Sequence, residues 1–344
     1  MKTVAIPGTD LRPSALCLGT NRFGTVIPAD DAFALLDAFV EVGGTFLDTA
    51  HIYADWIVGA PKSASEKTVG AWLRARGNRC ALTIATKGGH PELTTPRISR
   101  LSPGELAADL AASLENLGTD RLDLFWLHRD DPGIPVGDIL GPLEEFVRQG
   151  LIRYYGCSNW RAARIAQAQE YAAAHGLHGF AANQPQWSLA VPNRAGLSDP
   201  EHLVVMSADD YALHVRTGLA CMPWSSQGQG FFEKLARGGV DGLSAGDRRG
   251  YLNDLNLERW SPVSEMAERY GATLTAVALS FLISQPFVTV PIVGPRTAEQ
   301  LRTCVQALDL ALGPDELAFV SGGRMAAGMQ QAASAYESAG LTRR

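Results

Sequence analysis

Eight short apolar runs alternate with amphipathic stretches along nearly the whole chain, and this alternation constrains the fold more than any other feature. Runs that are apolar throughout are typical of strands covered on both faces, and helices between them imply a parallel sheet. Two folds fit this pattern, an open doubly wound sheet and a closed (β/α)8 barrel. The expected strands lie within residues 14–20, 45–50, 82–87, 122–128, 152–158, 180–186, 219–225 and 288–293.

The number of strands and their spacing favour the barrel. Each strand and its helix occupy roughly 30–40 residues, as in a (β/α)8 barrel. No Gly-x-Gly-x-x-Gly follows the first strand, so the fingerprint of a Rossmann dinucleotide site is missing. The sequence therefore predicts an α/β fold, a (β/α)8 TIM barrel over about residues 14–312. We expect one domain over residues 1–344, with a helical tail over residues 313–344.

Two segments outside the eight repeating units are also informative. Apolar residues 2–6 and 11–18 flank a Pro-Gly-Thr-Asp turn and predict a β-hairpin at the bottom of the barrel. Residues 225–259, rich in Gly, Arg and Asp, predict a long loop at the carboxyl-terminal face. Loops of that length in a compact domain are usually functional or disordered.

Helix starts are marked by serines followed by glutamates. Ser102 comes before Pro103 and three residues before Glu105, which is the pattern of an N-cap with a capping box. Ser63 and Glu66 have the same spacing and predict a second capping box.

Composition and charge narrow the class of protein. A net charge of −6 over 344 residues favours neither nucleic acid nor an anionic membrane as a partner. The longest apolar run, residues 272–284, is too short to span a bilayer, and the N-terminus has no signal-peptide pattern, so we expect a cytoplasmic protein. The cysteines form no Cys-x-x-Cys pair and predict neither a metal site nor disulfides. They are Cys17, Cys80, Cys157, Cys221 and Cys304.

Polar residues end several of the apolar runs. In a barrel the carboxyl ends of all strands meet at one rim, where the chemistry takes place. The second run ends at Asp48, the third at Lys87 and the fourth at His128, while Tyr53 follows in the loop after Asp48. Each residue alone has an ordinary interpretation, such as a turn cap or a solvated charge. An acid, a base, an imidazole and a phenol at one rim favour a catalytic site.

These four side chains suit protonation of a carbonyl oxygen. A free tyrosine titrates near 10 and is a poor acid at neutral pH. The ammonium of Lys87 beside Tyr53 would favour the phenolate and lower the pKa of the phenol. A buried lysine needs a counter-charge, which Asp48 would supply, and the imidazole of His128 could orient the carbonyl or share the proton.

Six segments of the chain resemble the aldo-keto reductase superfamily. They occur in order over about residues 10–312 and include most of the strand ends named above: GGTFLDTAHIY, ATKGG, SLENLGTDRLDLFWLH, RYYGCSNW, NQPQWSL and PIVGPRTAEQL. The resemblance implies a (β/α)8 barrel that binds a nicotinamide cofactor without a Rossmann domain. It also implies a catalytic tetrad of Asp48, Tyr53, Lys87 and His128, with Tyr53 as the general acid in reduction of a small aldehyde or ketone.

The same resemblance implies the positions that bind the cofactor. Ser158, Asn159 and Gln184 match the residues that bind the carboxamide. Trp224 matches the ring that stacks on the nicotinamide, and the loop after it matches the one that covers the pyrophosphate. The residues of this loop are Ser225, Ser226, Gln227, Gly228 and Gly230.

At the adenosine end the matching positions are Gly294, Arg296 and Gln300. Arg296 would meet a 2′-phosphate as a charge-assisted donor, which favours NADPH and NADP+ over NADH. Many family members have Glu-Asn a few residues later, where this chain has Thr303 and Cys304. That departure leaves room for NADH as well.

The loop after Tyr53 is longer than in many family members, and it carries Trp56. We expect Trp56, His90, Arg129 and Trp187 to line the substrate pocket. This mixture of aromatic and polar groups suits a sugar-like carbonyl, and it would also suit an aromatic aldehyde. Residues 325–340 are expected either to fold over the site or to pack as a helix.

Two other functions remain open at the level of the sequence. A nicotinamide-binding regulatory subunit of the same superfamily would keep tetrad-like residues. A (β/α)8 lyase or isomerase would bind no nicotinamide. The expected partner of the reductase is a small carbonyl compound, and its oligomeric state is left open.

Overall fold

The computed structural model describes residues 1–323, and its strands alternate with helices in the predicted order. Each strand overlaps one of the eight apolar runs. The strands are β1 (Cys17–Gly19), β2 (Phe46–Asp48), β3 (Thr83–Gly88), β4 (Leu122–Leu127), β5 (Ile152–Ser158), β6 (Ala182–Gln184), β7 (Ala220–Cys221) and β8 (Ile292–Val293). The residues form two compact units, the first being Met1–Gln184 with Arg296–Ala298 and the second Pro185–Pro295 with the segment from Glu299 onward.

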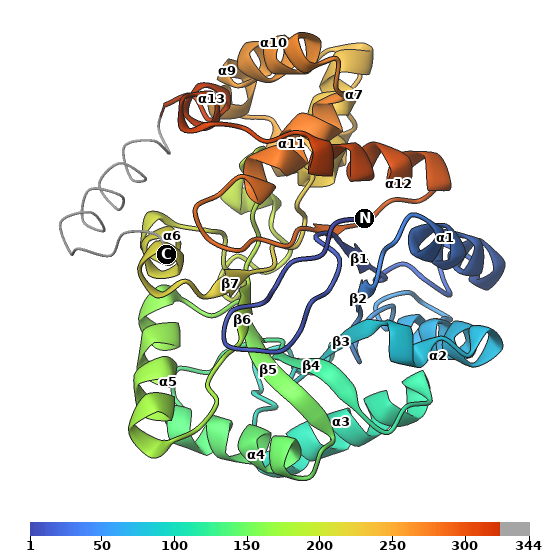
Figure 1. The fold of residues 1–344 in the computed structure, drawn as a ribbon, viewed down its shortest axis with the longest axis vertical. Helices are drawn as coiled ribbons and strands as arrows, with labels where there is room; N and C mark the ends of the chain where they lie inside the picture. The colour runs from blue at the N-terminus through green and yellow to red at the C-terminus, as the bar shows by residue number, and fades with distance from the viewer. Residues whose placement is uncertain (324–344) are drawn as a thin grey trace. The chain divides into compact units, whose positions relative to one another are not determined.

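The first unit contains six parallel strands in chain order, β1 to β6. Helices follow each of the first five strands, and in Figure 1 they lie along the outer side of the strands. Side chains of β2 and β4 are buried throughout, as expected for strands covered on both faces. The helices are α1 (Ala29–Glu41), α2 (Ala64–Arg76), α3 (Pro103–Leu117), α4 (Val136–Arg148) and α5 (Ala162–His175).

The N-terminal hairpin is present. Backbone hydrogen bonds join Val4 to Pro13 and Ile6 to Leu11, and Thr3 pairs antiparallel with Ser14. The turn contacts β5 near the start of that strand, where Asp10 accepts a hydrogen bond from the hydroxyl of Tyr154 at 2.9 Å. The hairpin therefore lies at the amino ends of the strands, opposite the rim that carries the polar residues.

One predicted helix cap is confirmed and the other is wrong. Ser102 and Glu105 form a capping box at the start of α3. Ser63 precedes α2 but makes no capping hydrogen bond. Glu66 is instead fully buried, where it accepts hydrogen bonds from Thr86 at 2.5 Å and Asn116 at 2.9 Å. The carboxylate of Glu66 contributes more to the stability of the fold by accepting from two donors in the interior than it would at a helix end.

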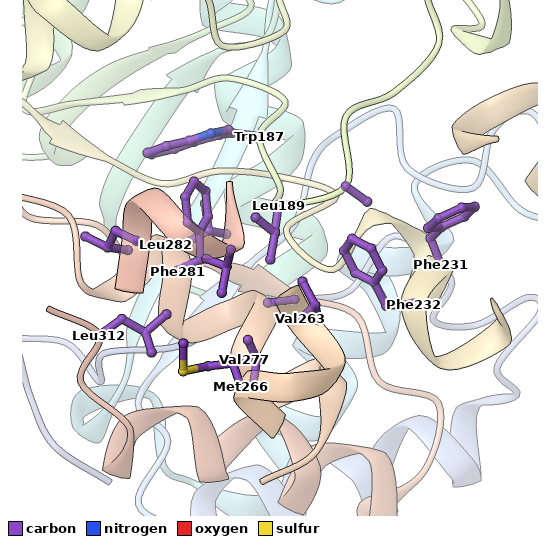
Figure 2. Packing of buried hydrophobic residues seen from close by; sticks show 14 of the residues in the cluster. Trp187, Leu189, Phe231, Phe232, Val263, Met266, Val277, Phe281, Leu282 and Leu312 are labelled. Atoms are coloured by element: carbon purple, nitrogen blue, oxygen red, sulfur yellow. The ribbon is translucent and has the colours of Figure 1, made fainter. Parts of the chain in front are cut away.

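The second unit contains β7, β8 and eight helices among the described residues. Its apolar core gathers buried side chains from segments far apart in the sequence, including Leu189, Val263 and Phe281 (Figure 2). The helices are α6 (Ala208–Thr217), α7 (Phe231–Gly238), α8 (Ala245–Tyr251), α9 (Asp254–Glu258), α10 (Trp260–Tyr270), α11 (Leu274–Ile283), α12 (Ala298–Val305) and α13 (Pro314–Val320).

The segment predicted as a long loop, residues 225–259, follows β7 and contains helices. Three short helices, α7 to α9, form within it. Phe231 and Phe232 bury their rings in the core of the second unit, and Ser244 caps α8 through a capping box with Asp247. Helices this short have too few turns to produce a clear helical periodicity of apolar residues in the sequence, and the glycines around them suggest a loop.

Each of the eight strands is followed in the chain by at least one helix, which is the order of a (β/α)8 fold. In residues 1–323 we find no helix with the length and apolar character needed to cross a membrane. The predicted tail segment at residues 325–340 lies outside the described residues.

Candidate active site

The first unit brings the four predicted catalytic residues together. Asp48 is the last residue of β2, Lys87 is the next to last of β3, and His128 follows β4 directly. Because β2, β3 and β4 are neighbours in one parallel ladder, their carboxyl ends lie side by side. Tyr53 comes from the loop that leaves β2.

Lys87 is the centre of this arrangement. Its ammonium is buried and donates to the carboxylate of Asp48, to the backbone oxygen of Thr49 at 2.8 Å and to the hydroxyl of Tyr53 at 2.8 Å. Burial alone would lower the pKa of Lys87, but Asp48 and then Tyr53 raise it above its usual range. The lysine therefore carries its charge at neutral pH.

Asp48 is held on its other side by Gln184, whose amide donates to it at 2.9 Å. Burial raises the pKa of Asp48, and the charge of Lys87 opposes that rise. The carboxylate and the ammonium stabilise each other inside a region from which water is excluded, so each depends on the other.

The prediction of a lowered pKa for Tyr53 is wrong in its net direction. Burial raises the pKa of the phenol more than the ammonium of Lys87 lowers it. Tyr53 is consequently protonated at neutral pH, as a proton donor must be. Lys87 Nζ also lies 4.5 Å from the centre of the Tyr53 ring, so its field acts on the phenol at close range.

His128 supplies a neutral imidazole. Its ring is 5.8 Å from that of Tyr53, measured between centroids. Burial, followed by the charges of His90, Arg129 and Lys87, lowers the pKa of His128 well below its usual range. In residues 1–323 its buried Nδ1 has no hydrogen-bond partner, which is uncommon for a buried polar atom.

The predicted carboxamide residues of the first unit are connected to the tetrad. Asn159 is in the left-handed region, with φ 60°, and its amide donates to the backbone oxygen of His128 at 3.3 Å. Ser158 donates to the backbone oxygen of Gln184 at 2.8 Å. These bonds fix the side chains of Ser158, Asn159 and Gln184 around the same strand ends.

Two buried residues at the start of α2 hold the backbone around the strand ends. Ser65 is buried and shares hydrogen bonds with the hydroxyls of Thr20 at 2.8 Å and Thr49 at 2.9 Å. Glu66 holds Thr86, the residue before Lys87. The sequence pattern predicted Glu66 only as part of a helix cap and did not single out Ser65, and the burial of both side chains shows their role.

The predicted substrate-pocket residues divide into two groups. Trp56 is 47% exposed, and its ring contacts that of Tyr53 edge-on at 5.9 Å. His90 contacts the ring of His128 at 4.8 Å, and Arg129 follows His128 in the chain. All three lie in the first unit with the tetrad.

Trp187 has a different role from the predicted one. It is 3% exposed and packs in the core of the second unit near Phe281 (Figure 2). Its ring also contacts the rings of Tyr211 and Phe287. A tryptophan just beyond a strand end can turn to either side, and the sequence around it does not say which.

The predicted pyrophosphate loop belongs to the second unit and is tightly turned. Ser225, Gly228, Gln229 and Gly230 all have left-handed backbone conformations. At Gly228 an added Cβ would lie 2.7 Å from that of Ala190, so only glycine fits without movement. Ser226 donates to the backbone oxygen of Ile292 at 2.6 Å, which joins the loop to β8.

Gln227 links the loop to the predicted adenosine end. Its amide oxygen accepts from Gly294 N at 3.4 Å, and its amide nitrogen contacts the sulfur of Cys304 at 3.4 Å. Cys304, one of the two residues at which this chain differs from many family members, thus contacts the loop through Gln227. Gln300, the other predicted adenosine residue of this unit, is exposed on α12. Trp224 precedes the loop, and its buried Nε1 has no hydrogen-bond partner in the described chain.

Arg296 lies in the first unit, close to a second arginine that the sequence interpretation did not single out. Burial, and then the charge of Arg296, lower the pKa of Arg22. Two exposed guanidinium groups that repel each other form a favourable place for an anion.

Comparison with known proteins identifies the family. The sequence profile of the Aldo/keto reductase family matches residues 15–321. The chain is 30% identical over 330 residues to norsolorinic acid reductase stcV of Emericella nidulans, covering 91% of this chain and 79% of the relative. It is 27% identical to an aryl-alcohol dehydrogenase [NADP(+)] of Phanerodontia chrysosporium, covering 92% and 83% of the two chains. An uncharacterized oxidoreductase of Bacillus subtilis, YrpG, is 30% identical over 91% of this chain and 93% of its own.

A solved structure shows the same fold. The thermostable aldo-keto reductase Tm1743, crystallised with the inhibitor epalrestat, matches with a TM-score of 0.69 and 24% identity over 94% of this chain and 99% of its own. The fold is therefore the (β/α)8 barrel that the sequence predicted. The chain belongs to the aldo-keto reductase family, whose members generally use NAD(P)H, and it is an oxidoreductase.

Proposed function

We propose that this enzyme reduces a small aldehyde or ketone to the alcohol with NADPH, and that Tyr53 is the general acid. The observation that carries the proposal is the hydrogen bond of 2.8 Å between Lys87 Nζ and the hydroxyl of Tyr53, with Asp48 behind the lysine. This arrangement places a protonated phenol and a fixed positive charge at one point. Such a point suits a carbonyl oxygen that gains negative charge.

In the proposed mechanism the substrate oxygen accepts a hydrogen bond from the hydroxyl of Tyr53. The nicotinamide, when bound, supplies the hydride that attacks the carbonyl carbon. Tyr53 then gives its proton to the developing alkoxide, and the ammonium of Lys87 stabilises the phenolate that remains. His128 is neutral and can donate one hydrogen bond to the same oxygen, which fixes the orientation of the carbonyl.

Asp48 and Gln184 act through Lys87. The carboxylate keeps the buried lysine charged, and the amide of Gln184 fixes the carboxylate at 2.9 Å. Ser158, Asn159 and Gln184 are oriented at the same strand ends and could bind the amide of the nicotinamide. Their carbonyl, hydroxyl and NH₂ groups match both the donors and the acceptor of a carboxamide.

The choice of NADPH rests on Arg296 and Arg22. A 2′-phosphate beside both guanidinium groups would remove their mutual repulsion and gain charge-assisted hydrogen bonds. The tightly turned loop from Ser225 to Gly230 fits the role of a cover for the pyrophosphate. One relative is named for NADP(+), which agrees with this choice.

The substrate we propose is an aromatic carbonyl compound. Trp56 extends the ring surface of Tyr53 and His128 toward solvent, so a planar substrate could stack beside the reacting oxygen. Two of the relatives are named for a norsolorinic acid substrate and for aryl alcohols.

The proposal predicts NADPH oxidation, followed at 340 nm, with a panel of benzaldehydes and short aldehydes. We expect the aromatic members to have the higher kcat/KM, because they bury more apolar surface against Trp56. Replacing Trp56 with Ala should reduce this preference and leave the rate with short aldehydes nearly unchanged. If no carbonyl compound on the panel is turned over while NADPH still binds, the proposed function is wrong.

Replacing Arg296 with Leu tests the cofactor choice. We expect the KM for NADPH to rise about 10- to 100-fold, as for the loss of a charge-assisted contact to phosphate. The KM for NADH should change little, because NADH has no 2′-phosphate. Arg302→Leu, an exposed arginine on α12, is the matched control and should leave both values unchanged. Equal effects of Arg296→Leu on both cofactors would contradict the assignment.

A further inference from the structure

A cavity beside the catalytic groups is lined almost entirely by polar side chains. It is small, with a volume of about 20 Å³, which is enough for one or two hydroxyl groups. Among its ten lining residues only Ile52 and Gly88 have no ionisable group. His90 lines this cavity and also contacts the ring of His128 at 4.8 Å, so the cavity begins next to the tetrad. Small-molecule pockets usually contain only a few polar groups, so eight residues with ionisable side chains around one cavity point to a ligand with polar groups.

Part of the lining holds the shape of the cavity. Arg100 forms ion pairs with Glu92 and Asp109. Asp109 also accepts from Gly89 N at 2.9 Å, which fixes the chain just after Lys87. These bonds leave the floor of the cavity rigid and its charges largely compensated. A rigid polar site loses little entropy when a ligand binds.

Two polar groups of the lining, on Lys62 and Asp55, are available to a ligand, and a third polar atom lies buried behind the lining. The buried Nε of Arg100 has no hydrogen-bond partner within residues 1–323, and an unsatisfied buried donor costs about 1–3 kcal/mol. Lys62 is exposed at the lining, and in the described part of the chain its ammonium makes no hydrogen bond or ion pair. Asp55 uses one carboxylate oxygen to accept from Ser63 N at 2.7 Å, and its second oxygen remains.

The balance of charge selects the kind of ligand. Three carboxylates and three cationic side chains line the cavity, so neither an anion nor a cation gains a net attraction. Hydroxyl groups both donate and accept, so they can satisfy both Asp55 and Lys62.

We infer that this cavity is a distal subsite that binds hydroxyl groups of the carbonyl substrate. The inference rests on the proposed function and makes it more specific. The carbonyl end of the substrate lies at Tyr53 and His128, its ring lies against Trp56, and its hydroxyl groups extend past His90 to Asp55 and Lys62. The preferred substrates are hydroxylated aromatic carbonyl compounds.

A matched pair of substrates tests the inference in the full-length enzyme with NADPH. 3,5-Dihydroxybenzaldehyde and 3,5-dimethylbenzaldehyde have nearly the same size, and their meta substituents affect the reactivity of the carbonyl little. We expect kcat/KM to favour the dihydroxy compound by about tenfold, the effect of one or two additional hydrogen bonds. 3-Carboxybenzaldehyde serves as the anionic probe and should show no such advantage.

Two variants locate the preference. Asp55→Asn keeps an oxygen for Ser63 N, and Lys62→Met keeps the length of the side chain. Each should lower the preference for the dihydroxy compound about three- to fivefold, mainly through its KM, and leave the dimethyl compound unaffected. Lys67→Met, an exposed lysine on α2 outside the cavity, is the control and should match the wild type.

The outcomes separate the inference from the proposed function. Equal kcat/KM for both aldehydes, or a preference that survives both variants, overturns the subsite while the reductase remains. An advantage for 3-carboxybenzaldehyde that Lys62→Met abolishes overturns the choice of hydroxyl groups in favour of an anion. Failure to reduce any of these aldehydes overturns the proposed function, and the subsite with it.

Discussion

Tyr53→Phe is expected to lower kcat for carbonyl reduction by about 10²- to 10⁴-fold, the usual contribution of a positioned general acid. Phenylalanine fills the same space and keeps the edge contact with Trp56, but it has no proton to give. The KM for the carbonyl and the binding of NADPH should change little, because the interaction that is lost forms mainly in the transition state. Steady-state kinetics and fluorescence titration with NADPH measure the two effects.

The control for this variant is Tyr270→Phe. Tyr270 is 43% exposed on α10 and lies in the second unit, so its hydroxyl can be removed without touching the tetrad. Its kcat should equal that of the wild type. A Tyr53→Phe enzyme that retains kcat but loses affinity for the carbonyl would show that the hydroxyl binds substrate and does not donate the proton.

The meeting of Asp48, Lys87 and His128 at one rim could be predicted from the sequence, because barrel geometry converts sequence position into spatial position. Asp48, Lys87 and His128 each end an apolar run, and parallel strands bring such ends to one rim. Tyr53 could be placed because the loop that carries it begins at Asp48. This prediction required only the order of the strands along the chain, and the apolar runs of the sequence show that order directly.

The direction of the pKa of Tyr53 could not be predicted in the same way. It depends on how much water surrounds the phenol compared with how close the ammonium of Lys87 lies. The sequence shows which charges are near but not how deeply they are buried. Burial is the larger effect here, so the pKa of the phenol is raised and the phenol is protonated at neutral pH, as the proposed general acid must be.

Trp187 and Glu66 show a second limit. Trp187 follows a strand end, and Glu66 stands three residues after a serine, so each fits a familiar local pattern. In the structure, tertiary packing determines both positions: Trp187 joins an aromatic cluster and Glu66 satisfies buried donors. A local sequence pattern shows which residue types a position tolerates, but the tertiary contacts of the side chain determine its role in the structure.

Lys87→Met is expected to have the largest effect on stability as well as abolishing reduction. The variant leaves the carboxylate of Asp48 buried with no counter-charge, and the loss of one partner of a buried ion pair costs about 3–5 kcal/mol of unfolding free energy. Urea unfolding, followed by tryptophan fluorescence, measures this cost.

The double variant Asp48→Asn with Lys87→Met separates stability from catalysis. It removes both charges, and its amide oxygen at position 48 can still accept from Gln184, so most of the lost stability should return. Activity should not return, because no charge remains beside Tyr53. Recovery of activity together with stability would mean that Lys87 supports the fold and has no part in proton transfer.

The pH dependence of the single variant distinguishes an unpaired charge from a packing defect. Burial raises the pKa of Asp48, and without Lys87 nothing comparable opposes that rise. An aspartate whose pKa in the folded protein exceeds its unfolded value of about 3.9 binds more protons when folded, so the folded state gains stability as the pH falls. The destabilisation by Lys87→Met should therefore be smaller at about pH 5.5 than at about pH 8, whereas the double variant should show the same cost at both values. An equal cost at both pH values in the single variant would attribute the loss to packing around the shorter side chain and not to the charge of Asp48.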